Sequence, residues 1–230
     1  MMFWWALPLT VLLYLAVKKL ARHYKSPLIN TILLPALMII GIVLATGQDI
    51  NDYQAGTQPL HYLLELVVVA FALPLYQQAT KIRQQLAPIL ICCSVSVIIS
   101  VGTTLLIGGL LHAQPSLLAS IATKSITTPL AMSVSETMGG IPAIAAGLVI
   151  IVGIMGAIFG FPILKLAGVV HPEAQGLAMG AGAHAIGIGA AAEVGPVQGA
   201  FASLAMVVCG ITTAIIAPPL FHLYLWLTLG

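Results

Sequence analysis

The chain has 230 residues, of which eight are Lys or Arg and six are Asp or Glu, while 60% are hydrophobic. With 6% charged residues against roughly 25% in a soluble domain, it cannot cover a water-exposed surface, which excludes soluble enzymes and disordered proteins. The net charge of +2 also argues against nucleic acid as a partner. The composition predicts an all-α polytopic membrane protein in contact with the lipid bilayer.

Four apolar runs in the first half of the chain predict full membrane spans, at residues 3–17, 28–46, 60–77 and 87–111. The loops after the first and third runs carry cations, and the other two carry none. These cations are Lys18, Lys19, Arg22 and Lys25, followed by Lys81 and Arg83. The positive-inside rule therefore places both cationic loops in the cytoplasm and the N-terminus outside.

The second half of the chain changes character, because its apolar runs become shorter and are interrupted. Residues 116–123 and 130–138 flank the polar stretch 124–129, and residues 174–183 and 190–195 flank the stretch 184–189; a long apolar run, 143–164 or 197–229, follows each pair. Shifting the sequence by 57 residues places Glu136 on Glu193 and Pro162 on Pro219. We therefore predict a duplicated core, with units of about 116–170 and 171–230, beside a scaffold formed by residues 1–115.

Each broken element either crosses the membrane or turns back as a re-entrant hairpin. A crossing would leave Lys165 outside, whereas a hairpin entering from outside returns Lys165 to the cytoplasm and makes the two units inverted. The charge pattern thus favours six full spans plus two broken or re-entrant helical elements in an inverted repeat. Repeats of broken helices are typical of the binding core of secondary transporters, because their free backbone groups at membrane depth can hold a solute or an ion.

The tips of the two broken elements carry the candidate binding residues. Ionisable side chains at membrane depth are functional candidates, and a lysine beside hydroxyl groups suits a small carboxylate. The alternative is that this lysine extends its ammonium group to the interface. The predicted binding residues are Lys124, Ser125, Thr127 and Thr128 at the first tip, and His184 and Gly187 at the second.

Two carboxylates follow the breaks at matching positions. Glu136 and Glu193 are candidates to balance Lys124, to bind a coupling cation or to carry a proton. The alternative is a pair of carboxylates at helix ends near the membrane interface. We expect no metal, no cofactor and no catalysis, since the sequence has no metal-ligand spacing, nucleotide-binding loop or Ser/His/Asp arrangement.

Four segments resemble the signature blocks of the LrgB/CidB family: Lys124–Met132, Gly139–Ala143, Gly176–Gly180 and Ala183–Gly187. The resemblance extends over essentially the whole chain, although Ile188 stands where the family pattern leads us to expect Thr. It implies a bacterial inner-membrane protein, antiholin-like, with a small membrane partner of the LrgA/CidA type. The related half of the plastid glycolate/glycerate translocator, and carriers linked to pyruvate, imply transport of small monocarboxylates. We also expect a homo-oligomer.

Two functions from different classes are therefore open. The first is a proton- or cation-coupled transporter of a glycolate-, glycerate- or pyruvate-like monocarboxylate. The second is an antiholin-like regulator of murein hydrolase export and autolysis, which oligomerises without carrying a solute. A pore-forming protein needs neither duplicated broken helices nor a single buried lysine, so the sequence favours the transporter. An enzyme acting within the membrane is less favoured, because no nucleophile is paired with a base.

Overall fold

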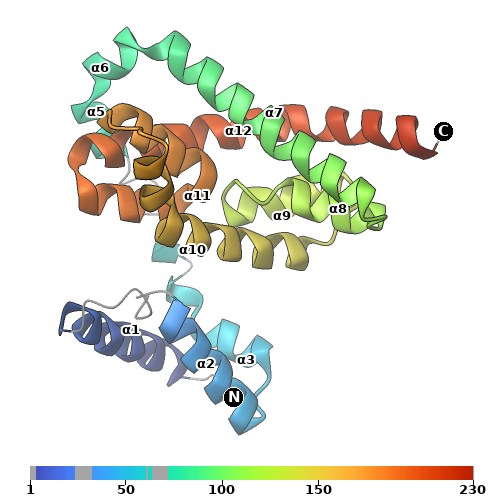
Figure 1. The fold of residues 1–230 in the computed structure, drawn as a ribbon. Coiled ribbons are helices and arrows are strands. Elements are labelled where there is room, and N and C mark those ends of the chain that lie inside the picture. The colour runs from blue at the N-terminus through green and yellow to red at the C-terminus, as the bar shows by residue number, and fades with distance from the viewer. Residues whose placement is uncertain (1–3, 24–32, 61, 64–71, 230) are drawn as a thin grey trace. The chain divides into compact units, whose positions relative to one another are not determined.

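The computed structural model describes all residues except 1–3, 24–32, 61, 64–71 and 230. Every regular element among the described residues is a helix, which confirms the all-α prediction (Figure 1). The chain divides into two compact units, Met1–Ala72 and Leu73–Gly230. The functional division into a scaffold of residues 1–115 and a core from residue 116 stays a prediction.

The first unit contains the helices α1 (Ala6–His23), α2 (Leu33–Thr46) and α3 (Ile50–Gly56). The predicted first span thus continues through its two lysines, and the predicted loop at 47–59 contains the short helix α3. Asp49 makes this helix possible, because its side chain accepts a hydrogen bond from the Asn51 N–H at the helix N-terminus. Parts of the predicted second and third spans lie outside the described residues.

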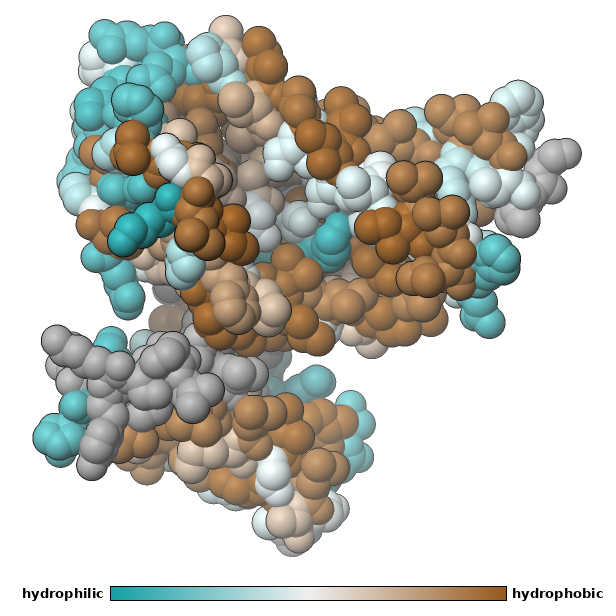
Figure 2. Space-filling model, in the orientation of Figure 1, coloured by the Kyte–Doolittle hydropathy of each residue, from teal (hydrophilic) through white to brown (hydrophobic). Residues whose placement is uncertain are grey.

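The second unit contains α5 (Ala72–Gln77) at its boundary, then α6 (Ala79–Gln84), α7 (Leu86–Leu110), α8 (Pro115–Ala122), α9 (Thr128–Thr137), α10 (Pro142–Leu166), α11 (Pro172–Val194) and α12 (Pro196–Leu229). Among the described residues, α7, α10, α11 and α12 are long and apolar enough to cross a membrane. Apolar residues cover much of the visible surface, and polar residues gather where α5 and α6 lie (Figure 2). A surface of this kind suits lipid, so the chain is a multi-pass membrane protein.

The first broken element is a hairpin. The segment 123–127 between α8 and α9 is not helical. After α9, the Ile141 N–H donates a hydrogen bond of 2.7 Å to Ser120 Oγ in α8. A helix continuing in one direction would place these two residues about 30 Å apart, at 1.5 Å per residue. The chain therefore turns back at 123–127, as a re-entrant element does.

The second broken element is also a hairpin, although it contains a single non-helical residue. His184 has φ 40° and ψ −131°, which divides α11 into a first arm before it and a second arm after it. At the start of α12, the Gln198 backbone oxygen is only 2.5 Å from the position that a Cβ on Gly176 would take. Because Gly176 lies near the beginning of the first arm, the second arm must run back along the first. By length and composition α11 could span a membrane, but the chain turns back at His184 within it.

The two hairpins and the helices that follow them form an inverted repeat. Contacts between α10 and α11 pair residues in opposite order: Gly160 with Met179, Gly156 with Ala183 and Gly153 with His184. Contacts between α11 and α12 pair residues in the same order: Gly176 with Gln198 and Gly180 with Ala202. Helix α10 is therefore antiparallel to the first arm of α11, and α12 is parallel to it. The two long helices after the hairpins run in opposite directions.

The hairpins have the same length and the same spacing as the predicted repeat. Pro115 and Pro172 begin them, Thr137 and Val194 end them, and each pair is 57 residues apart. Proline suits the first turn of a helix, because the N–H it lacks would have no partner there. The same offset superimposes Thr127, the last residue before the returning arm of the first hairpin, on His184, the break in the second.

One ion pair fixes which loops share a face of the second unit. Lys81 Nζ in α6 lies 3.6 Å from Glu173 Oε1 at the start of α11. The loop between α10 and α11, which follows Lys165 in the last turn of α10, is therefore on the same face as Lys81. If residues 116–138 crossed the membrane, these two loops would lie on opposite faces. The ion pair and the Ser120–Ile141 hydrogen bond thus agree on a re-entrant element.

Candidate functional site

Lys124 lies at the tip of the first hairpin and is directed toward α7. Its ammonium group donates hydrogen bonds to the backbone oxygen and the hydroxyl oxygen of Ser100, both at 3.2 Å, and to Thr104 Oγ1. Ser100 and Thr104 are four residues apart, so they lie on one face of α7. The next tip residue, Ser125, places its hydroxyl 3.1 Å from that of Ser100. Lys124 and Ser125 are thus anchored together on one polar face of α7.

A small cavity adjoins these residues where α7, α11, α12 and the first tip meet. Its hydroxyl-bearing lining residues are Ser96, Ser100, Ser125 and Thr213, and Ala181 and Cys209 complete the part that faces α11 and α12. Its volume of about 10 Å³ is about the space that one water molecule needs. Ala181 is three residues before His184, so the first tip and the first arm of the second hairpin line the same cavity.

The positive charge of Lys124 has no carboxylate partner among the described residues, where Lys81–Glu173 is the salt bridge present. The side chain is partly buried and all three of its hydrogen-bond acceptors are neutral. A cation held within the membrane without a counter-charge is unfavourable, and such residues mark substrate or ion pathways. The site can therefore accept an anion, whose carboxylate would replace the neutral acceptors.

His184 is buried at 3% exposure and its ring is directed at α10. Its Nε2–H donates a hydrogen bond of 2.8 Å to the Val149 backbone oxygen. No described contact joins its ring to Lys124. Gly187 packs just behind it, with Met179 and Ala183 in the space that a side chain at 187 would need. The structure therefore gives both residues a packing role at the second tip, and their role in binding a solute stays a prediction.

The remaining predicted residues lie at the two ends of the hairpin arms. Thr127 and Thr128 begin α9, where Thr127 is the N-cap residue without a side-chain capping bond. Glu136 and Glu193 are exposed in the last turns of the returning arms, away from the tips. Their positions match in the two repeats, and their coupling role stays a prediction.

The residues that the sequence analysis missed are the hydroxyls of α7. Ser96, Ser100 and Thr104 recur every fourth residue in a mostly apolar helix, a spacing that places them on one face. This periodicity was visible in the sequence. It did not stand out because serine and threonine are common in membrane helices, where each can hydrogen-bond to its own backbone, as Thr103 does to Ile99.

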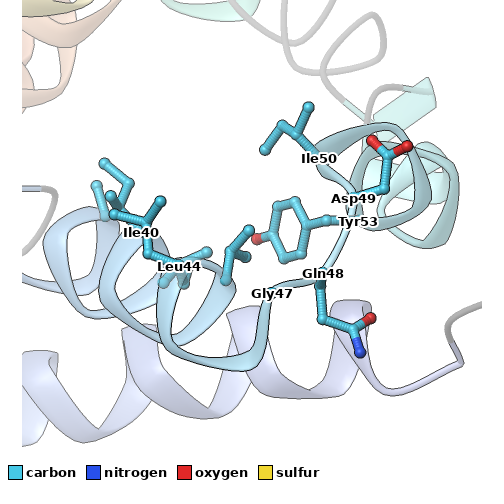
Figure 3. A pocket seen from close by; sticks show the side chains of 10 residues that line it. Ile40, Leu44, Gly47, Gln48, Asp49, Ile50 and Tyr53 are labelled. Carbon is cyan, nitrogen blue, oxygen red and sulfur yellow. The ribbon is translucent and has the colours of Figure 1, made fainter.

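The first unit contains a separate groove of about 740 Å³ between α2 and α3 (Figure 3). Figure 3 shows Ile40, Leu44 and Ile50 around the Tyr53 ring, with Asp49 at the edge. The Asp49 carboxylate accepts hydrogen bonds from Asn51 at the N-terminus of α3. The groove therefore offers an apolar surface without a free charged group. It is therefore a weaker candidate for binding a charged solute than the Lys124 site.

Comparison with known proteins identifies the family. The sequence pattern described as the LrgB-like family matches residues 10–223, nearly the whole chain. The chain belongs to the LrgB-like family.

Relatives of this LrgB-like chain match it over most of their own length. An uncharacterized protein of Haemophilus influenzae is 38% identical over 215 residues, covering 94% of this chain and 93% of the relative. The protein YwbG of Bacillus subtilis is 32% identical, covering 91% and 93%. A Bacillus mycoides protein named antiholin-like protein LrgB is 36% identical, covering 86% and 87%. No solved structure matches the chain.

Proposed function

We propose that this LrgB-like protein is a secondary transporter of a small monocarboxylate, of the glycolate, glycerate or pyruvate type, in the bacterial inner membrane. The carboxylate binds Lys124 at the first hairpin tip, and Ser125, Thr127 and Thr128 surround it. The cationic loops face the cytoplasm and the N-terminus faces the periplasm. Glu136 and Glu193 couple the movement to protons or cations.

The observation that carries the proposal is the partly buried Lys124 at a re-entrant tip, hydrogen-bonded to neutral groups alone. A bound anion would supply the negative charge that the Lys124 ammonium group lacks. A transporter also needs a site that opens to either side of the membrane. The opposed hairpins support this, because inverted repeats with broken helices allow a central site to do so. The cavity beside Lys124 is too small for a carboxylate as it stands, so binding requires the first tip to separate from α7.

The names of relatives favour a second candidate function. Proteins 36% identical to this chain are named antiholin-like protein LrgB. On this reading the chain regulates murein hydrolase export and autolysis as an oligomer, together with a small LrgA/CidA-type membrane protein, and carries no solute. The two functions differ in whether the isolated protein moves a carboxylate stoichiometrically.

Uptake into proteoliposomes separates these candidates. The full chain is reconstituted with an imposed proton or sodium gradient, and entry of labelled glycolate and pyruvate is measured together with release of an entrapped uncharged dye. A transporter gives saturable uptake that depends on one gradient and releases no dye. We expect Lys124→Ala to abolish uptake, whereas Lys165→Ala, at an exposed position in the last turn of α10, leaves it unchanged. Saturable uptake that survives Lys124→Ala would refute the site.

Coupling is tested in the same vesicles by substituting the two matching glutamates one at a time. Glu136→Gln or Glu193→Gln is expected to make uptake insensitive to the gradient while solute exchange across the membrane continues, because exchange needs binding but no net ion movement. If neither variant alters the dependence on the gradient, the coupling role is wrong and the carboxylates serve as helix-end groups.

A further inference from the structure

The cavity beside Lys124 is lined by more hydroxyl groups than the lysine uses. Ser100 and Thr104 bind its ammonium group, and Ser100 also contacts Ser125. The hydroxyls of Ser96 and Thr213 line the same cavity but make no hydrogen bond with any described residue. Thr213 is a buried residue at 4% exposure, whereas Ser96 is partly exposed. Hydroxyls without protein partners that line a cavity of this size can bind a water molecule or a polar group of a ligand.

These groups come from two helices outside the hairpin tips. Ser96 and Ser100 lie on one face of α7, and Thr213 approaches from α12. The two helices are packed in parallel, because Cys93 contacts Cys209 and Gly109 contacts Tyr224. Residues 96–100 and 213 therefore face each other at the same depth, a short distance from the Lys124 ammonium group.

We propose that the hydroxyls of Ser96, Ser100 and Thr213 form a subsite for the oxygen on C2 of the solute, so that α7 and α12 select 2-hydroxy and 2-oxo acids over plain carboxylates. The proposal rests on the proposed function, in which the carboxylate itself binds Lys124. A hydroxyl or keto oxygen on C2 lies next to the carboxylate, as this cavity lies next to Lys124. When the tip separates from α7, the solute takes the place of the lysine's contacts with Ser100 and Thr104.

The selection follows from the hydrogen bonds that are lost when a solute has no oxygen on C2. A bound carboxylate with no oxygen on C2 would shield these hydroxyls from water without forming hydrogen bonds to them. A site that hydrogen-bonds its solute binds an analogue that lacks the bonding group much more weakly. A serine hydroxyl can donate or accept, so the same subsite accommodates either a keto or a hydroxyl oxygen.

Matched pairs of solutes test the inference directly. Glycolate is compared with acetate, and lactate and pyruvate with propionate, because the members of each set differ only at C2. Thermal stability of the purified full chain in detergent measures binding through ligand-dependent stabilisation, independently of transport. The wild type is expected to bind glycolate at least about tenfold more tightly than acetate, which corresponds to one net hydrogen bond.

Each subsite variant has a neighbouring control on its own helix. Ser96→Ala, Ser100→Ala and Thr213→Val are each expected to lower the ratio of glycolate to acetate affinity about tenfold. Ser96→Ala and Thr213→Val leave acetate binding unchanged, whereas Ser100→Ala also removes a hydrogen bond of Lys124. Ser94→Ala and Thr212→Val are the controls, because neither side chain lines the cavity. Their glycolate-to-acetate ratio is expected to remain that of the wild type.

The outcomes separate this inference from the proposed function. The subsite is supported if the ratio of glycolate to acetate affinity falls in the three subsite variants but not in the controls. An unchanged ratio in all three variants overturns it, while uptake by the wild type still supports transport. Stabilisation by 2-hydroxy acids without uptake overturns transport and retains the subsite. If no carboxylate stabilises the protein or enters the vesicles, both proposals are wrong.

Discussion

The His184 ring donates a hydrogen bond of 2.8 Å from Nε2 to the Val149 backbone oxygen, joining the second hairpin tip to the middle of α10. Gly153 makes this contact possible. A Cβ on Gly153 would lie 2.6 Å from His184 Cε1 and 2.8 Å from Nε2, which is too close for any side chain. A glycine on one repeat and a histidine on the other are thus packed as a pair, which fixes the depth of the second tip against α10.

The first prediction concerns this glycine. Gly153→Ala is expected to displace the His184 ring and to destabilise the protein by about 1–3 kcal/mol, as overpacked cores do. Gly147→Ala, on the same helix, is the control, since no atom lies within 4 Å of its added Cβ. Thermal unfolding in detergent measures both. Equal stability of the two variants would contradict the close packing of His184 against α10.

The second prediction concerns the backbone of His184. At φ 40° and ψ −131° the residue adopts a conformation that glycine tolerates and other residues adopt only under strain. Both His184→Gly and His184→Ala lose the ring and its hydrogen bond, but only alanine retains the strain. We therefore expect His184→Gly to be the more stable variant by about 1 kcal/mol, measured by thermal or denaturant unfolding. The opposite order would indicate an ordinary helical bend at this residue.

A third prediction tests how α11 packs on α12. A Cβ on Gly180 would collide with the Ala202 backbone, whereas a Cβ on Gly182, two residues further, meets no atom within 4 Å. Gly180→Ala is expected to destabilise the protein by about 2 kcal/mol or more, because a backbone cannot move aside as a flexible side chain can. Gly182→Ala should be neutral or slightly stabilising. Folded yield and melting temperature of the two variants distinguish these outcomes.

The re-entrant path predicts which residues share a side of the membrane. On a background without Cys92, Cys93 and Cys209, single cysteines are introduced at Arg83, Lys165 and Gln114. A membrane-impermeant thiol reagent should label Arg83→Cys and Lys165→Cys from one side, and Gln114→Cys from the other. Labelling of positions 165 and 114 from the same side would instead mean that residues 116–138 cross the membrane.

Much of the second unit could be predicted because each break has a local chemical cause. The polar stretch at 124–129 ends an apolar run, and the helix after it begins at Thr128 with a proline in its first turn. The offset of 57 residues follows from repeated residue types and corresponds to the spacing of the two hairpins. The hairpin path was predicted from one cation, Lys165, and the Lys81–Glu173 pair supports it on independent grounds.

The candidate site was predictable only in part. Lys124 stood out because charge is scarce in this chain, but its acceptors are Ser100 and Thr104, some twenty residues earlier in a different helix. His184 matches the first tip in the repeat, yet its ring contacts Val149 on α10. Which helix faces a given side chain depends on how helices pack, and apolar sequences permit many packings of similar energy.

The sequence by itself determined that the chain lies in a membrane and that Lys124 carries an uncommon charge, and it predicted a duplicated and broken second half. These properties follow from composition and local backbone chemistry, which need no partner helix. The tertiary structure decided that both broken elements turn back, that they oppose each other, and that α7 and α12 supply the hydroxyls beside Lys124. Those relationships depend on close contacts between residues distant in sequence, where the absence of a single Cβ, as at Gly153 or Gly180, determines which helices can meet.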